Sequence, residues 1–115
     1  MEFKTGDVIA DRPSWWLYDD RHELIAWAGE MFASLTDADA AAAHFAYGAS
    51  RARFELYQDR TGAWRWRAHL GDTLVASGSE GFHSEIAARR AANTVRDNVA
   101  RATPAPGRLR ATAHG

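Results

Sequence analysis

The fold of this 115-residue chain is decided by residues 54–101, FELYQDRTGAWRWRAHLGDTLVASGSEGFHSEIAARRAANTVRDNVAR. Residues 54–57, 64–70 and 74–77 carry the aromatic, alternating or apolar patterns that are typical of β-strands. The turn between the first two strands contains Gly62, and glycine adopts positive φ without steric cost. The stretch therefore predicts a three-stranded meander that leads into a single helix.

The second predicted strand contains the sequence Trp-Arg-Trp-Arg at residues 64–67. Strict alternation sends Trp64 and Trp66 to one face of the sheet and Arg65 and Arg67 to the other. Single-stranded nucleic acids are bound where aromatic and basic side chains share an exposed face. We therefore expect the tryptophans to pack beneath helices, with the two arginines on an open sheet face.

The turn at residues 71–72 leaves two registers open for the second hairpin. A two-residue loop places Ala68 on the face of Val75, whereas a three-residue loop pairs Ala68 with Ala76. The choice matters because a one-residue slip moves every side chain to the other face of the sheet. We favour the longer loop because it gives the more uniformly apolar face.

The helix that follows begins after Ser84, a residue type suited to the N-cap, and Glu85 lies in the first turn, where its charge is favourable. The predicted inward stripe consists of small or branched apolar residues, namely Ala88, Ala91, Ala92, Val95 and Val99. The outward positions include three arginines, Arg89, Arg90 and Arg96. Residues 103–107, TPAPG, end the helix.

The first half of the chain is similar to the second at a separation of fifty residues. The ungapped alignment pairs aromatic, acidic and serine residues as well as alanines: Trp16 with Trp66, Phe32 with Phe82, Glu30 with Glu80, and Ser34 with Ser84. Self-similarity at a fixed period indicates a repeat architecture. We read the two glutamates and two serines as equivalent corner residues, and we expect Thr36 or Asp37 to cap the first helix, with Ser34 as a cap or pre-helix residue.

The predicted fold is α+β, with tandem βββα repeats that form one mainly antiparallel sheet and two helices packed on one face. A single three-stranded unit with one helix leaves a large face uncovered, and two units bury it mutually. We therefore divide the single domain 1–115 into a degenerate repeat at residues 1–50, a well-preserved repeat at residues 51–102, and a C-terminal tail at residues 103–115 with a short strand at residues 108–112.

Several features of residues 53–100 occur together in one family: FELY at residues 54–57, the Gly62 turn, WRWR at residues 64–67, Ala76-Ser77, EGFHS at residues 80–84, and the alanine-rich helix. They resemble the YegP-like repeat, a small bacterial and archaeal domain of unassigned function. Gly71-Asp72 replaces the Asn-Gly turn that is usual there. The resemblance implies tandem or dimeric βββα units that share one antiparallel sheet and exchange C-terminal strands, and it supplies no catalytic residues.

Composition limits the classes of function. The chain has no cysteine, which excludes disulfides and thiolate chemistry, and no apolar run of membrane-spanning length. The N-terminus lacks a signal-peptide pattern, so we expect a cytoplasmic protein with no membrane partner. Residues 1–50 contain three basic and nine acidic residues, whereas residues 51–115 contain eleven basic and six acidic ones. This asymmetry is typical either of a nucleic-acid face or of two halves that complement each other.

Candidate catalytic and metal-binding residues are few. The five histidines show no metal-ligand spacing, so we predict no metal site and no cofactor. Glu30 and Glu80 would form a paired-carboxylate site only if they lay within several ångströms of each other. The simpler hypothesis is that each carboxylate accepts hydrogen bonds at a strand-to-helix corner. We therefore predict no catalytic residues.

Three hypotheses about function follow. The leading one is a non-enzymatic binding or interaction module that uses the exposed sheet face, with an unidentified partner such as another protein. The alternative is a nucleic-acid-binding protein that uses Arg65, Arg67, Arg89, Arg90 and Arg96. The third is an enzyme with an inter-repeat cleft that contains Glu30 and Glu80. The repeats are compatible with a monomer that has internal pseudo-symmetry or with a homodimer.

Overall fold

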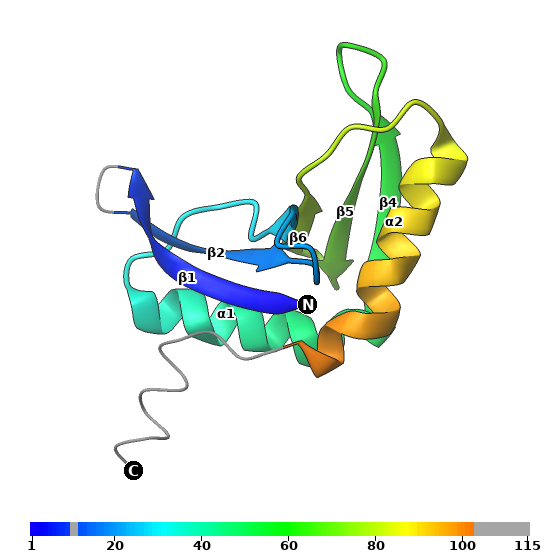
Figure 1. The fold of residues 1–115 in the computed structure, drawn as a ribbon. Helices are drawn as coiled ribbons and strands as arrows, with labels where there is room; N and C mark the ends of the chain where they lie inside the picture. Colours follow the sequence, from blue (N-terminus) through cyan, green and yellow to red (C-terminus); the bar gives the residue numbers. More distant parts are fainter. Residues whose placement is uncertain (10–11, 103–115) are drawn as a thin grey trace.

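A six-stranded antiparallel sheet carries both helices on one face (Figure 1). The computed structural model describes residues 1–9 and 12–102. Its elements in chain order are β1 (Glu2–Ile9), β2 (Arg12–Tyr18), β3 (Leu24–Trp27), α1 (Leu35–Gly48), the 3-10 helix η1 (Ala49–Arg51), β4 (Arg53–Gln58), β5 (Trp64–Leu70), β6 (Thr73–Gly78), α2 (Glu85–Asn98) and the 3-10 helix η2 (Val99–Arg101). The predicted α+β fold of tandem βββα repeats is confirmed. The strand predicted at residues 108–112 lies outside the described residues.

The two repeats meet at the centre of the sheet, whose strand order is β1-β2-β3-β6-β5-β4. Trp27 of β3 lies opposite Ser77 of β6, and the two residues occupy the same position in their repeats because they are fifty residues apart. The helices and the 3-10 helices obey the same spacing. A pseudo-two-fold axis therefore passes through the β3–β6 pair. Among the described residues, each repeat contributes its three strands as one block, and none is exchanged.

Both helices begin at equivalent serines. Ser34 Oγ accepts the main-chain N–H of Asp37 at 3.1 Å, and Ser84 Oγ accepts that of Ala87 at 3.1 Å. The cap predicted at Ser84 is therefore confirmed. The cap predicted at Thr36 or Asp37 is wrong, because both residues lie within the first turn of α1, where the Asp37 main chain is the donor.

The predicted equivalence of Trp16 with Trp66 is wrong, because the first two strands are displaced by one residue. Strand pairing makes Leu17 equivalent to Ala68, since each lies opposite the corresponding alanine of its third strand. The separation between equivalent residues is therefore 51 in the first two strands of each repeat and fifty in the rest. Trp15 is thus the counterpart of Trp66, and Trp16 belongs to the opposite face.

The displacement arises between β2 and β3, because the segment between the paired residues Leu17 and Ala26 is one residue longer than the segment between Ala68 and Ala76. The Asp19 N–H donates to the Glu23 carbonyl at 2.9 Å, and His22 adopts a φ of 65°. Positive φ is uncommon for a residue other than glycine, although histidine tolerates it better than most. Because of this extra residue, the side chains of β2 point to the faces opposite to those that the ungapped alignment assigns to them.

The hairpin between β5 and β6 has the predicted pairing but not the predicted loop. Leu70 pairs with Thr73 across a two-residue turn, so the three-residue loop is wrong. Ala68 nevertheless pairs with Ala76, because a β-bulge after Ala68 absorbs Val75 as the extra residue. The register of this hairpin therefore depends on the bulge as much as on the loop.

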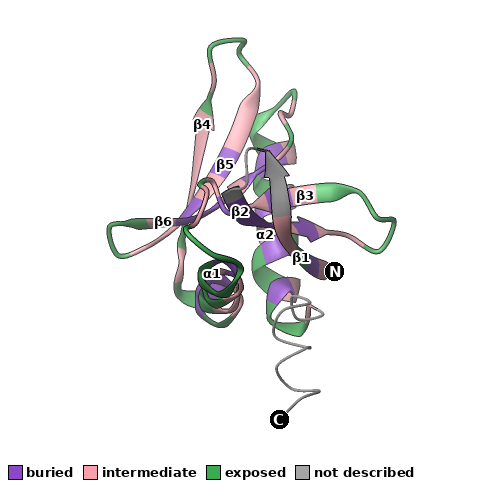
Figure 2. Cartoon of the chain, turned by 90° about the vertical axis from the view of Figure 1, so that its left-hand side faces the viewer, coloured by how far each residue is buried: buried purple, intermediate pink, exposed green. Residues whose placement is uncertain are grey.

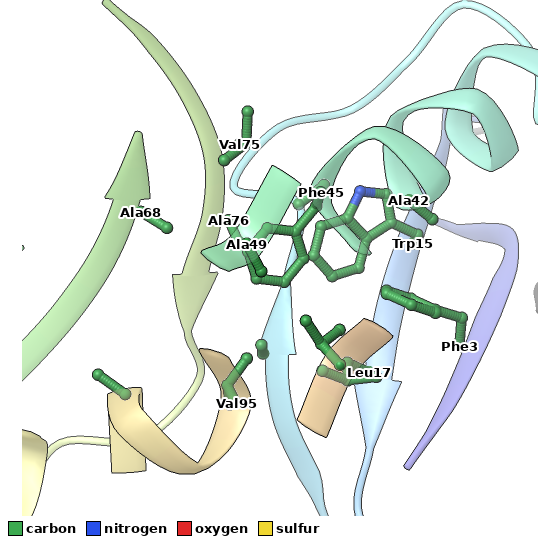
Figure 3. Packing of buried hydrophobic residues seen from close by; sticks show 14 of the residues in the cluster. Phe3, Trp15, Leu17, Ala42, Phe45, Ala49, Ala68, Val75, Ala76 and Val95 are labelled. Atoms are coloured by element: carbon green, nitrogen blue, oxygen red, sulfur yellow. The ribbon is translucent and has the colours of Figure 1, made fainter. Parts of the chain in front are cut away.

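A series of aromatic contacts joins the two repeats beneath the sheet. Trp15 stacks on Phe45 of α1, with ring centres 5.5 Å apart, and meets Phe3 edge-on at 5.3 Å (Figure 3). Phe45 contacts Phe54 at 6.4 Å, and Phe54 contacts Trp66 at 5.5 Å. The inward sides of both helices are buried and their outward sides are exposed (Figure 2). This core determines which face of the sheet is covered and leaves the other face open.

Candidate binding face

The face of the sheet away from the helices is called the open face here. Because Trp15 packs against α1 and side chains alternate along a strand, Trp16 lies on the open face. Strand register aligns it with one residue from each other strand, giving a row of six: Lys4, Trp16, Trp27, Ser77, Arg67 and Glu55. This set is called the central row. At the usual distance between strands it spans about 24 Å.

The two halves of the central row differ chemically. The half from the first repeat contains two adjacent tryptophans, Trp16 and Trp27, both half-buried. The equivalent positions of the second repeat hold Arg67 and Ser77. The open face therefore has an aromatic half and an ionic half, although both belong to one continuous sheet.

A shallow groove of about 330 Å³ runs over the aromatic half. Apolar side chains and one arginine line it, together with a serine: Trp16, Leu24, Trp27, Met31, Arg65 and Ser79. None of the described residues that line it carries a carboxylate. The groove therefore offers an apolar surface with a cation at its side.

Arg65 and Arg67 of the ionic half are each held by a carboxylate. Arg67 Nε lies 2.5 Å from Glu55 Oε1, and the Arg67 guanidinium lies 4.6 Å from the ring centre of Tyr57. Arg65 Nε lies 2.6 Å from Asp59 Oδ2. A guanidinium has five N–H donors, so a bond made through Nε does not exhaust them. The two arginines are thus held in place and can still bind a ligand.

The hydrogen bonds of these ion pairs shift the pKa values of Glu55, Asp59 and Arg67. The hydrogen bond from Arg67 lowers the pKa of Glu55, and Glu55 raises the pKa of Arg67. The pKa of Asp59 is held well below its usual range, first by the Thr61 hydroxyl and then by Arg65. Glu55, Asp59 and Arg67 are therefore all charged at neutral pH.

The five arginines predicted as nucleic-acid contacts do not form one surface. Arg65 and Arg67 share the open face. Arg89, Arg90 and Arg96 are exposed on α2, which packs against the covered side of β4 and β5. A ligand on the open face would therefore contact two of the five.

The corner glutamates line different pockets. Glu30 lines one of about 130 Å³ and Glu80 its pseudo-symmetric counterpart of about 230 Å³. At the first corner, Ser14 Oγ donates to the main-chain carbonyl of Glu30 at 2.8 Å, so this hydrogen bond involves the backbone rather than the carboxylate. A mechanism that needs both carboxylates at one substrate gains no support from this arrangement.

Metal-binding and membrane-spanning features also bear on function. Within residues 1–9 and 12–102, no group of three or more His, Asp or Glu side chains is placed to hold a metal ion. His114 lies outside that part of the chain. Neither described helix is long and apolar enough to cross a membrane.

Trp16 and Trp27 are the open-face residues that the sequence interpretation missed. The ungapped alignment matched Trp16 with Trp66 and so assigned it to the core. A usable signal was present, because the consecutive residues Trp15 and Trp16 of a strand must point to opposite faces. One of the two therefore had to lie outside the core.

A six-stranded antiparallel sheet built from two βββα repeats, with both helices on one face, is the fold of the YegP-like proteins. The solution structure of yegP from E. coli, a protein of unknown function, matches this chain with a TM-score of 0.75 and 15% identity, covering 91% of each chain. A UPF0339 protein from Shewanella oneidensis matches with a TM-score of 0.75 and 11% identity, over 90% of this chain and 89% of that one. No family model matches the sequence, and no curated protein is significantly similar to it. The resemblance to YegP-like proteins is thus confirmed for the fold.

Proposed function

We propose that this protein is a small non-enzymatic binding module that recognises its partner through the open face. The observation that carries the proposal is the pair formed by Trp16 and Trp27 on the uncovered side of the sheet. Exposed apolar patches rimmed by polar groups mark interaction sites. Tryptophan and arginine are also the residues most enriched among those that dominate binding energy.

The second repeat supports this interpretation as an internal control. Its sheet has the same three-stranded architecture with Arg67 and Ser77 at the positions of Trp16 and Trp27. The fold therefore does not require tryptophan at these two positions. Recognition of a partner gives them a role that packing alone does not.

The proposal assigns no catalysis because the ionisable residues with repeat-equivalent positions are kept apart. Glu30 and Glu80 line different pockets. The Glu80 pocket is also lined by Asp19 and Glu23, and Asp19 Oδ1 accepts the main-chain N–H of Glu23 at 3.0 Å and thereby stabilises the turn after β2. Asp19 thus has a structural role, and the two repeat-equivalent glutamates do not converge on one substrate as an acid–base pair must.

The proposal is tested by comparing what two variants retain from an extract of the native host. The double variant Trp16→Ala/Trp27→Ser removes the aromatic half, and its serine is the residue that the second repeat carries. The matched control Arg89→Ala/Arg90→Ala removes two exposed side chains from α2. We expect the control to retain the same proteins and nucleic acids as the wild type and the tryptophan variant to lose them. Equal retention by all three would exclude the open face as the binding surface.

A further inference from the structure

We propose that the partner of the open face is a single-stranded nucleic acid, whose bases stack on Trp16 and Trp27 while its phosphates contact Lys4, Arg65 and Arg67. The inference rests on the proposed function, because it names the ligand of the same face. It differs from a surface made of the second repeat's arginines, since both tryptophans and the lysine come from the first repeat.

Basic side chains lie on both sides of the two adjacent tryptophans in the central row. Trp16 and Trp27 are direct cross-strand neighbours, and Lys4 lies one strand beyond Trp16. Arg67 lies two strands beyond Trp27, about 10 Å away. Sheets that bind single strands place stacking aromatic residues and basic residues on one face in this way. Within residues 64–67 the tryptophans and arginines point to opposite faces. The fold instead places tryptophans of the first repeat on the same face as Arg65 and Arg67.

The charge of the open face is compatible with an anionic ligand that also stacks. Among the residues whose side chains the structure describes, four basic and three acidic ones lie on this side: Lys4, Arg53, Arg65 and Arg67, with Glu2, Glu55 and Asp59. The groove over the tryptophans contains Arg65 and, among its described lining residues, no carboxylate. Because Glu55 and Asp59 cancel part of the positive charge, stacking has to supply much of the affinity.

The position of the tryptophans favours a nucleic acid over an extended peptide. A peptide that binds by strand addition needs a free sheet edge. The edges are β1 and β4, whereas Trp16 and Trp27 lie on the interior strands β2 and β3. Planar bases suit this flat surface because every base has a π-face, and the Ser77 hydroxyl beside Trp27 can bond to base edges.

Fluorescence anisotropy with labelled oligothymidine of about 12 nucleotides, a length within the range bound by single-strand platforms, measures the interaction. Titrations at about 50 and 200 mM salt separate stacking from charge, because each neutralised phosphate contributes about 0.7 to the slope of log Kd against log salt. With three cationic contacts we expect a slope of about 2 for the wild type. A duplex of the same length is expected to bind more weakly because its bases are already stacked.

Each variant is chosen to change mainly one measured quantity, either the affinity or the salt slope. Trp16→Ala/Trp27→Ser is expected to weaken binding by about 30-fold or more while leaving the salt slope unchanged. Arg67→Gln/Glu55→Gln removes both charges of one ion pair and is expected to lower the slope by about 0.7. Arg89→Ala/Arg90→Ala is expected to bind like the wild type. Trp27→Ser alone, the milder change, is expected to weaken binding by about tenfold if the double variant does not fold.

The outcomes distinguish this inference from the proposed function. Absence of binding by the wild type at low salt, or unchanged binding by the tryptophan variant, would overturn the nucleic-acid inference. If the tryptophan variant still loses its partner from the host extract, the open face remains the binding surface and the partner belongs to another class, such as a peptide. If the tryptophan variant keeps both the oligonucleotide and the partner from the host extract, both proposals fail.

Discussion

The covered and open faces of the sheet have kept the symmetry of the two repeats to different degrees. On the covered face, three equivalent pairs are identical, namely Trp15 and Trp66, Phe3 and Phe54, and Ala26 and Ala76, and a fourth pair, Leu17 and Ala68, is apolar in both repeats. On the open face, the equivalent positions differ: Trp16 and Arg67, Trp27 and Ser77, Lys4 and Glu55. The two faces belong to the same strands, so the difference lies in what each face contacts.

The comparison shows which residues the architecture requires. Covered positions must fill the space between sheet and helices at high density, which leaves few alternatives. Open positions meet no helix, so their chemistry is free to differ between repeats. The combination of aromatic and ionic halves arises only when both repeats are present in one sheet. The candidate site therefore belongs to the pair of repeats and not to either one.

The largest expected effects come from breaking the covered face. Trp66→Ala and Trp15→Ala should each lower the free energy of unfolding by about 3–5 kcal/mol, because each removes a fully buried aromatic side chain. Trp16→Ala should cost no more than about 1 kcal/mol, since Trp16 lies on the open face. Urea denaturation of the three variants measures the difference. Equal costs for Trp15→Ala and Trp16→Ala would contradict the one-residue displacement of β2.

A smaller effect is expected where the covered face leaves no room for a side chain. A Cβ at Gly78 would lie 2.5 Å from Trp66 Nε1, so Gly78→Ala should cost about 1–3 kcal/mol through overpacking. Gly6→Ala is the matched control, because a Cβ there has no described atom within 4 Å and should change stability by less than about 0.5 kcal/mol. Thermal unfolding of both variants distinguishes the two sites. A neutral Gly78→Ala would show that Trp66 can shift.

The helix caps should show the symmetry that the open face lacks. Ser34→Ala and Ser84→Ala each remove one hydrogen bond of 3.1 Å to a main-chain N–H, so each should cost about 1 kcal/mol. Urea denaturation of the two single variants compares them directly. Costs that differ by more than about 1 kcal/mol would show that the corners are not energetically equivalent.

The smallest expected effect is the loss of stability at acidic pH that results from protonation of carboxylates in the ionic half. The folded state lowers the pKa values of Glu55 and Asp59, so their stabilising contribution is complete above their unfolded pKa values and is lost as pH falls below about 4. Melting temperatures recorded from neutral to acidic pH should fall less steeply for Glu55→Gln and Asp59→Asn than for the wild type. Asp72→Asn, in the exposed turn before β6, serves as the control and should follow the wild-type curve. Identical slopes for all variants would show that the ion pairs do not stabilise the fold.

Local patterns in the sequence were enough to predict the elements and the covered face. The alternation of residues 64–70 placed Trp66 and Ala68 inside, and Ser84 identified the start of α2, because each depends on neighbouring residues alone. The placement of Trp16 failed because an ungapped alignment cannot detect a one-residue insertion in a turn. The loop before β6 failed for a related reason, since a bulge can change the register as a loop does.

The combination of the two halves of the candidate site could not be predicted, because it depends on contacts between the repeats. The pairing of Trp27 with Ser77 joins β3 to β6, and it is this pair that places Trp16 and Arg67 in one row. A pattern among neighbouring residues does not predict pairing between two residues that are fifty positions apart in the chain. Sequence reasoning identified the arginines of the open face but searched for their aromatic partners within the same strand.

The central claim is that the ligand binds where the aromatic half meets the ionic half. The indole N–H signals of the five tryptophans, recorded by ¹H–¹⁵N NMR during a titration with oligothymidine, test it directly. We predict that the signals of Trp16 and Trp27 shift while those of the buried Trp15 and Trp66 stay in place. Unmoved Trp16 and Trp27 signals, with or without shifts on α2, would contradict the account.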